Sequence, residues 1–191
     1  MFQKLPDFEL LALQGADEAY VGFARALELA SAVEEYPFEK REERYGPRGV
    51  FQNFFSCEER QIPLDSPVRE FSRECARALM RKGGWRFDGE LCFNDHLILK
   101  YPAHAGVALG AHRDYSEYRN LIVSITLRGR ASFNLHPEPD VRPNLSYAMA
   151  PGWGVAMVAP GFMGREERPW HSVSGVGEER ISLILKQRKE S

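Results

Sequence analysis

Short segments in which apolar and polar residues alternate fill the second half of this chain, and they constrain its fold more than any other feature. Leu121 to Leu127 and Ala131 to His136 both have this period of two, which is typical of a strand with one buried face. Because only Arg128-Gly129-Arg130 separates them, we expect a hairpin. Similar runs predict four further strands, at Leu91 to Tyr101, Val155 to Val158, His171 to Val176 and Arg180 to Lys186.

Many short strands separated by Gly and Pro favour a sandwich or barrel over a doubly wound sheet. We therefore predict an α+β, mainly β fold with a jelly-roll core over residues 91–188 and N-terminal helices packed on one sheet. No repeat or linker divides the chain, so residues 1–191 are expected to form a single domain. Its residues 1–90 are expected to be a helical N-terminal part, in which residues 36–65 are a candidate substrate lid.

Two helices are predicted in the first third of the chain. The first spans Asp17 to Glu35, where apolar residues recur at helical spacing. The second spans Ser66 to Lys82, because Ser66 suits an N-cap, Pro67 suits the first helical position and Gly83-Gly84 provides an exit. The expected buried positions are Tyr20, Phe23, Ala24, Leu27 and Ala30 in the first helix, and Val68, Phe71, Cys75 and Leu79 in the second.

The charge of the chain bears on nucleic-acid binding. Twenty-five Lys and Arg against 27 Asp and Glu give a net charge of −2, which disfavours a strongly basic nucleic-acid binder. A local stripe of arginines nevertheless runs along the second helix at intervals of four residues: Arg69, Arg73, Arg77 and Arg81. Such a stripe is typical of a solvated face with weak ion pairs, and the alternative is a ridge that contacts phosphates.

Cysteine usage and the start of the chain indicate a cytoplasmic location. The three cysteines are odd in number and their spacing matches neither a disulfide framework nor a zinc knuckle. We see no secretory signal, so a reducing cytoplasm is expected. The longest uncharged stretch, Leu145 to Gly164, is interrupted by two prolines and four glycines, and we do not expect it to span a membrane.

Two segments carry metal-ligand residue types. In His112-Arg113-Asp114 the His and Asp are two residues apart, so on an extended segment both side chains point to one side. His171 follows 59 residues later, at the start of a predicted strand. Two neutral imidazoles and one carboxylate can occupy one face of an octahedral iron(II) and leave three positions open. A competing set is His136 with Glu138 and His171, although Pro137 and Pro139 favour a bend out of the sheet there.

A cationic anchor is predicted in the last strand. Arg180 and Ser182 share one face of that strand and lie just after His171 in the chain. If this face looks into the barrel, the planar guanidinium can bind both oxygens of a carboxylate. The expected partner is the distal carboxylate of a dicarboxylic oxo acid.

Taken together, these motifs resemble the Fe(II)- and 2-oxoglutarate-dependent dioxygenases, and within them the AlkB-like branch. The resemblance covers about Phe93 to Gln187 and implies a double-stranded β-helix core. It also implies that His112, Asp114 and His171 bind Fe(II), and that Tyr101, Arg180 and Ser182 contact 2-oxoglutarate. This chain has Leu99, Ser182 and Lys186 where the branch usually has two Asn and a second Arg. The motifs that carry the resemblance are Phe93-Asn94, Tyr101, His112-Arg113-Asp114 with Glu117, Ile122 to Leu127, Gly152 to Val155, and His171.

The resemblance implies an oxidoreductase that uses O2, Fe(II) and 2-oxoglutarate. We expect it to hydroxylate a C–H bond of a small-molecule or amino-acid-like substrate, with release of succinate and CO2. Two alternatives stay open: oxidative demethylation of a methylated nucleobase, and a non-catalytic jelly-roll module that binds metal or acts as a sensor. Base flipping would need a stacking aromatic, for which Tyr45, Phe51, Phe54 and Phe55 are candidates. Tyr115 and Glu117, which follow the metal motif, are the candidate substrate contacts.

Overall fold

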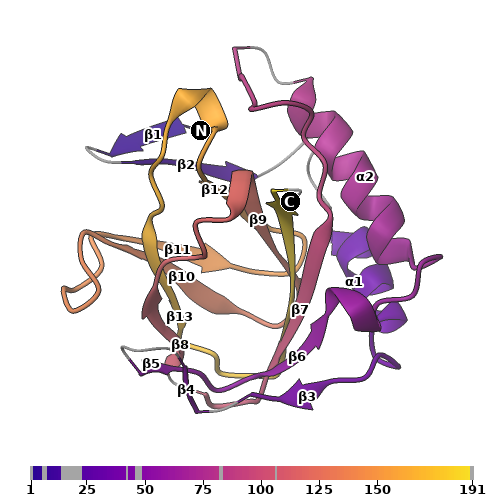
Figure 1. Cartoon of the computed structure of the whole chain (residues 1–191). Coiled ribbons are helices and arrows are strands. Elements are labelled where there is room, and N and C mark those ends of the chain that lie inside the picture. The colour runs from indigo at the N-terminus through magenta and orange to yellow at the C-terminus, as the bar shows by residue number, and fades with distance from the viewer. Residues whose placement is uncertain are drawn as a thin grey trace.

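In a computed structural model of the chain, the described residues form two main β-sheets, a two-stranded ribbon and two α-helices (Figure 1). The structure describes residues 2–5, 8–13, 23–41, 43–45, 49–81, 84–105 and 107–189. Both helices lie on the same side of the molecule, against the larger sheet (Figure 1). The predicted mainly β architecture, with helices packed on one sheet, is therefore observed. Within the described ranges, no helix combines the length and the apolar composition needed to cross a bilayer.

The larger sheet has eight strands in the order β1-β2-β12-β9-β14-β7-β6-β3, and the pairings between neighbours are antiparallel. At its centre β14 pairs with β9 on one side and with β7 on the other. Its strands are β1 (Phe2–Leu5), β2 (Phe8–Leu13), β3 (Glu39–Lys40), β6 (Phe55–Glu58), β7 (Asp95–Tyr101), β9 (Tyr118–Arg128), β12 (Gly154–Val158) and β14 (Arg180–Arg188).

The smaller sheet has the order β11-β10-β13-β8. A separate two-stranded ribbon, β4 with β5, lies beside β8 (Figure 1). The strands of these two units are β4 (Arg44–Tyr45), β5 (Val50–Phe51), β8 (Val107–His112), β10 (Ala131–His136), β11 (Leu145–Met149) and β13 (Trp170–Ser174). Strands β1 to β6 lie within residues 1–90 and were not expected, so the N-terminal part is less helical than predicted. Strands β8 and β11 were not expected either.

The predicted hairpin between residues 121–127 and 131–136 is wrong. Both strands form, but β9 belongs to the larger sheet and β10 to the smaller one. The link crosses from one sheet to the other at Gly129, which has φ +73°. A Cβ on Gly129 would lie 2.4 Å from the carbonyl oxygen of Glu179 and 2.9 Å from the Cα of Arg180, so only glycine fits this crossing. The alternation of residues identifies a strand but does not identify its partner.

The first helix, α1 (Phe23–Ala32), is shorter than the predicted helix, of which residues 17–22 lie outside the described ranges. Of its predicted buried positions, Ala30 is buried, Leu27 is 41% exposed, and the side chains of Phe23 and Ala24 lie outside the described residues. The described residues of this segment that enter the core are Ala26, Leu29, Ala30 and Val33, which follow an i, i+3, i+4, i+7 spacing. Of these four, Ala30 alone was predicted.

The second helix, α2 (Pro67–Met80), agrees with its prediction. Ser66 is the N-cap and accepts a hydrogen bond from the backbone N–H of Val68, and Pro67 occupies the first turn. The predicted face is buried: Val68, Phe71, Cys75 and Leu79 are all at most 6% exposed. Two short 3-10 segments complete the fold, η1 (Glu59–Gln61) and η2 (Phe162–Gly164).

Candidate active site

Pairing between β8 and β13 brings two histidines from distant parts of the sequence together. His112 ends β8 and lies directly opposite His171 in the register of the two strands. The ring centroids are 4.2 Å apart. Asp114 follows just past the end of β8, and its Oδ2 lies 3.4 Å from Nε2 of His171. One ligand atom from each of the three residues lies within 4.8 Å of the others, so they can share one metal ion.

Backbone carbonyls fix the orientation of both imidazoles. Nδ1 of His112 lies 2.9 Å from the carbonyl oxygen of Gly110, and Nδ1 of His171 lies 3.2 Å from that of Pro169. When Nδ1 donates to a carbonyl, the lone pair is left on Nε2, which is the arrangement that a metal ligand needs. Burial, with a smaller electrostatic effect of the neighbouring His112, lowers the pKa of His171 to about 4, so its ring is neutral at pH 7. Phe133 stacks on the His171 ring at 5.5 Å.

The competing set of His136, Glu138 and His171 is not brought together. His136 lies opposite Trp170, one residue away from His171 in the register, so the His136 and His171 side chains leave opposite faces of the smaller sheet. Both ring nitrogens of His136 are engaged, Nδ1 with the carbonyl of Val141 and Nε2 with the hydroxyl of Ser172.

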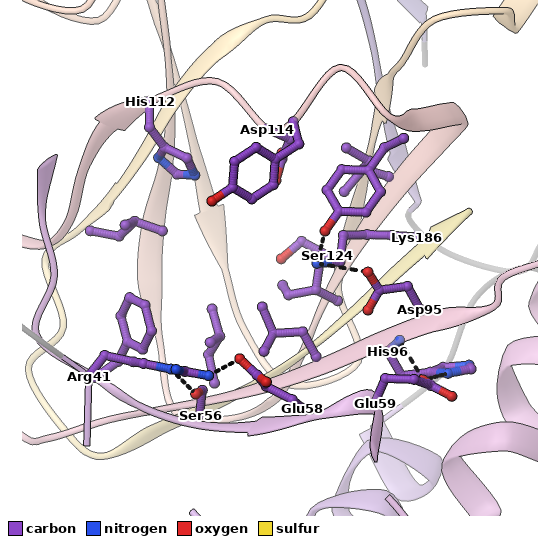
Figure 2. Close-up of a pocket in the computed structure, with 18 of the residues that line it drawn as sticks. Arg41, Ser56, Glu58, Glu59, Asp95, His96, His112, Asp114, Ser124 and Lys186 are labelled. Atoms are coloured by element: carbon purple, nitrogen blue, oxygen red, sulfur yellow. Dashed lines mark hydrogen bonds and ion pairs between the residues drawn. The ribbon is translucent and has the colours of Figure 1, made fainter. Parts of the chain in front are cut away.

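A cavity of about 1550 Å³, which we call the central cavity, lies between the two sheets and is lined by all three candidate ligands. Figure 2 shows His112 and Asp114 on one wall and Arg41, Ser56 and Glu58 on the opposite wall. Ile184 and Lys186 of β14 also line it. Because side chains alternate along a strand, Arg180 and Ser182 lie on the same inward face as those two residues.

Arg180 is a buried arginine on this inward face. It is 1% exposed, and its guanidinium donates to the hydroxyls of Ser182 (3.2 Å) and Thr126 (3.0 Å). Its Nε has no hydrogen-bond partner among the described residues, and no carboxylate there forms an ion pair with it. A buried cation without an acidic partner is costly, so this position suits an anion that arrives with a ligand.

Tyr101 adjoins this arginine. It lies directly opposite Arg180 in the register of β7 and β14, its ring centroid is 5.1 Å from the guanidinium carbon, and it lines the central cavity. Burial raises the pKa of the Tyr101 phenol, so the hydroxyl stays a hydrogen-bond donor at neutral pH. Tyr101, Arg180 and Ser182, three residues predicted to contact 2-oxoglutarate, are therefore neighbours.

The two candidate substrate contacts differ in their placement. Tyr115 lines the central cavity and is 49% exposed at its rim. Glu117 is not on the cavity wall: its carboxylate pairs with Arg188 at 3.2 Å instead. Glu117 lies close to the metal motif in the sequence but not in the structure, because the turn before β9 directs its side chain toward the end of β14.

Several residues of the cavity wall were not predicted from the sequence as site residues. Lys186 is buried, and its Nζ donates to the hydroxyl of Tyr118 at 3.0 Å and lies 3.8 Å from a carboxylate oxygen of Asp95. Figure 2 marks the contact between Lys186 and Asp95. Burial alone would lower the pKa of Lys186, but Asp95 and Tyr118 outweigh burial and raise it. Arg168 donates to the carbonyl of Asp114 at 2.9 Å.

Comparisons with known proteins place the fold. No family model matches the chain, and no curated protein matches it. The structure resembles a prolyl hydroxylase from Trichoplax adhaerens, solved with a peptide fragment of the hypoxia inducible factor oxygen degradation domain, with a TM-score of 0.61 and 14% identity over 94% of this chain and 83% of that one. It resembles OsALKBH1 with a TM-score of 0.61 and 15% identity over 98% and 100%.

A third likeness is to an oxidoreductase of the 2OG-Fe(II) oxygenase family from Burkholderia pseudomallei, with a TM-score of 0.53 and 15% identity over 93% of this chain and 82% of that one. At these identities the likenesses bear on the fold. They confirm the prediction of a jelly-roll fold of the kind that 2OG-Fe(II) oxygenases have.

Proposed function

We propose that this protein is an Fe(II)- and 2-oxoglutarate-dependent dioxygenase that hydroxylates a C–H bond of a small-molecule or amino-acid-like substrate, with release of succinate and CO2. The observation that carries the proposal is the joint placement of His112, Asp114 and His171 on the wall of the central cavity. The inward face of the same fold also holds Arg180, which has no acidic partner among the described residues. The fold shared with 2OG-Fe(II) oxygenases supports the same reaction class.

The donor set suits iron(II). Two imidazoles with their Nδ1 atoms facing carbonyls and one carboxylate make up a facial set for an octahedral ion, and they leave the other positions to ligands that enter from the cavity. Bound iron and 2-oxoglutarate would supply the oxidising power that replaces a hydrogen of the substrate by a hydroxyl group.

The residues of this chain have four tasks in that reaction. His112, Asp114 and His171 hold the metal. Arg180, with Tyr101 and Ser182 beside it, binds the distal carboxylate of 2-oxoglutarate and so orients the cosubstrate. The rim residue Tyr115 contacts the substrate, and the apolar wall around Phe133 keeps water away from the metal end.

The test is conversion of 2-oxoglutarate to succinate by the purified protein with Fe(II) and O2, across a panel of small acids, amides and amino acids. We expect succinate from the wild type and a loss of at least about 100-fold in His112→Ala, because two ligands hold iron poorly. His104→Asn is the matched control, since His104 is exposed in a turn outside the cavity wall. Absence of succinate under all conditions would favour the non-catalytic module.

Demethylation of a nucleobase ranks second. Of the four aromatic candidates for base stacking, Phe54 is buried and packs edge-on against Tyr101 at 5.6 Å, and the side chain of Tyr45 lies outside the described residues. Arg69 of the arginine stripe already donates hydrogen bonds to the carboxylate of Glu59 and to three backbone carbonyls, those of Glu59, Ile62 and Pro63. Release of formaldehyde from a methylated single-stranded oligonucleotide, with binding that weakens steeply with salt, would reverse this ranking.

A further inference from the structure

We propose that the substrate carries an oxyanion, a carboxylate or a phosphate, and that Arg168 binds it beside the metal. This inference rests on the proposed function and names the substrate class of the same site. It follows from the charge of the cavity wall, the engagement of its carboxylates and the placement of Arg168.

The wall of the central cavity is cationic although the chain as a whole is not. Among the described residues, eight Lys and Arg side chains line the cavity against four carboxylates. The whole chain has 25 basic and 27 acidic residues and a net charge of −2. Iron(II) and the dianion of 2-oxoglutarate would together add no net charge, so the excess of cations would remain for the substrate. A cavity lined by one sign of charge favours ligands of the opposite sign.

Each carboxylate of this wall is already engaged, so the described wall offers no free acid to a cationic substrate. Asp114 belongs to the candidate metal site, and the other three carboxylates each pair with basic side chains: Glu58 with Arg41 and Arg60, Glu59 with Arg69 and His96, and Asp95 with Arg188 and Lys186.

Arg168 differs from these paired cations. Arg168 is a half-buried residue of the cavity wall, and the one hydrogen bond of its guanidinium within the described part of the chain goes to an uncharged group, the backbone carbonyl of Asp114. That contact holds the guanidinium next to one metal ligand, and Arg168 precedes a second, His171, by three residues. A planar cation with donors to spare can bind both oxygens of a carboxylate or two of a phosphate.

This position distinguishes Arg168 from Arg180. Arg180 is fully buried against Tyr101, whereas Arg168 lies at the metal end of the cavity, in the loop before β13. An anion bound by Arg168 therefore belongs to the substrate and lies close to the candidate ligands. The C–H bond to be oxidised is then only a few bonds from the anionic group.

Binding of matched ligands tests the inference without turnover. The Mn(II)-loaded protein with saturating 2-oxoglutarate is titrated calorimetrically with straight-chain carboxylates of three to six carbons, with their primary amides and with the corresponding alkylphosphonates. The amide has the shape of the acid without its charge, and the phosphonate separates phosphate-type from carboxylate-type recognition. We expect at least one acid or phosphonate to bind about tenfold or more tightly than its amide, as charge-assisted hydrogen bonds allow.

Two substitutions and one control assign the effect to Arg168. Arg168→Gln should reduce the preference for the anion to less than about twofold, and Arg168→Lys should keep part of it. Arg165→Gln removes the same charge from the same loop, but Arg165 pairs with Glu167 and is not on the cavity wall, so this variant should keep the wild-type preference. The KM for 2-oxoglutarate should stay within about twofold in all three variants.

The inference is overturned if no acid or phosphonate binds more tightly than its amide, or if Arg168→Gln weakens 2-oxoglutarate instead of the anion. Failure of the proposed function has a different signature, since it appears as absence of succinate while the calorimetric preference for anions persists.

Discussion

At the scale of single residues, Arg180 is a buried cation that has no acidic partner in the described part of the chain. Its contacts are two hydroxyls and an aromatic ring, and its Nε makes no hydrogen bond within the described ranges. Burial lowers the pKa of this guanidinium, although not far enough to remove its charge near neutral pH. A residue of this kind contributes little to the stability of the ligand-free protein and much to the binding of an anion.

Replacement of this residue by Met should therefore separate stability from binding. We expect Arg180→Met to be at least as stable as the wild type in denaturant without ligands, because a buried charge is removed. The KM for 2-oxoglutarate should rise about 100-fold, since two charge-assisted hydrogen bonds are lost. Arg180→Lys should give an intermediate KM. Normal binding of 2-oxoglutarate by Arg180→Met would show that its carboxylate is held elsewhere.

At the scale of elements, the crossing at Gly129 positions the start of β14 and hence Arg180. Gly129→Ala should lower the free energy of unfolding by about 2 to 4 kcal/mol, because the new Cβ meets backbone at 2.4 Å and the residue has a positive φ. Gly84→Ala is the control: Gly84 also has a positive φ, +82°, but a Cβ there would meet no described atom within 4 Å, so we expect a loss of only about 1 kcal/mol. Denaturant unfolding compares them, and equal losses would contradict the steric explanation.

A second element-scale feature ties η1, β7 and α2 together through His96. Its Nδ1 lies 2.5 Å from Glu59 of η1 and its Nε2 lies 2.7 Å from Ser72 of α2. Burial lowers the pKa of His96, against the opposing effect of Glu59. The pKa of Glu59 is also lowered, because hydrogen bonds from His96 and Arg69 outweigh its burial. The native pair is thus a neutral imidazole and an ionised carboxylate.

This pair predicts acid sensitivity. Below about pH 6.5 the unfolded chain protonates His96 while the native chain does not. The contribution of His96 to the free energy of unfolding is therefore complete above that pH and is lost as the pH falls toward the lowered pKa. Below about pH 4.5 the loss from Glu59 adds in the same direction. In His96→Asn, the free energy of unfolding measured in denaturant should change less with pH between pH 5 and 7. It should also be about 1 to 2 kcal/mol lower than that of the wild type at pH 7. The exposed control His104→Asn should keep the wild-type slope.

At the scale of the whole molecule, a metal at the candidate site would join β8, β13 and the loop after β8. At a Mn(II) concentration of about 100 times Kd, binding should add about 2.7 kcal/mol to the free energy of unfolding. For a chain of this length, that corresponds to a rise in Tm of about 5 to 10 °C. Calorimetric scans should show this rise in the wild type and in Arg180→Met, and should not show it in Asp114→Ala.

The extent to which the sequence predicted this molecule depends on the range of the interactions. Local features were predictable: the N-cap and first turn of α2, and the strand period of β9, β10 and β14. Pairings between distant strands were not, so β9 and β10 were assigned to one hairpin although they lie in different sheets.

The same limit applies to the candidate site. The His-x-Asp motif marked two residues locally, whereas the register that sets His171 opposite His112 emerges only in the folded sheet. The sequence did not mark Arg168 as a site residue. The segment Arg165 to Arg168 contains two basic and two acidic residues, which is typical of a solvated loop. Its role depends on a carbonyl 54 positions earlier in the chain.

The strand β8 that carries His112 is the terminal strand of the smaller sheet. Its inner side pairs with β13 through an irregular register, and its outer side is bridged at Gln52 and Asn53. A metal ion bound by both His112 and His171 would hold β8 against β13. Removal of the metal would then loosen β8, an edge strand that can pair with strands of other molecules. We therefore expect a sample treated with a chelator to aggregate before it unfolds.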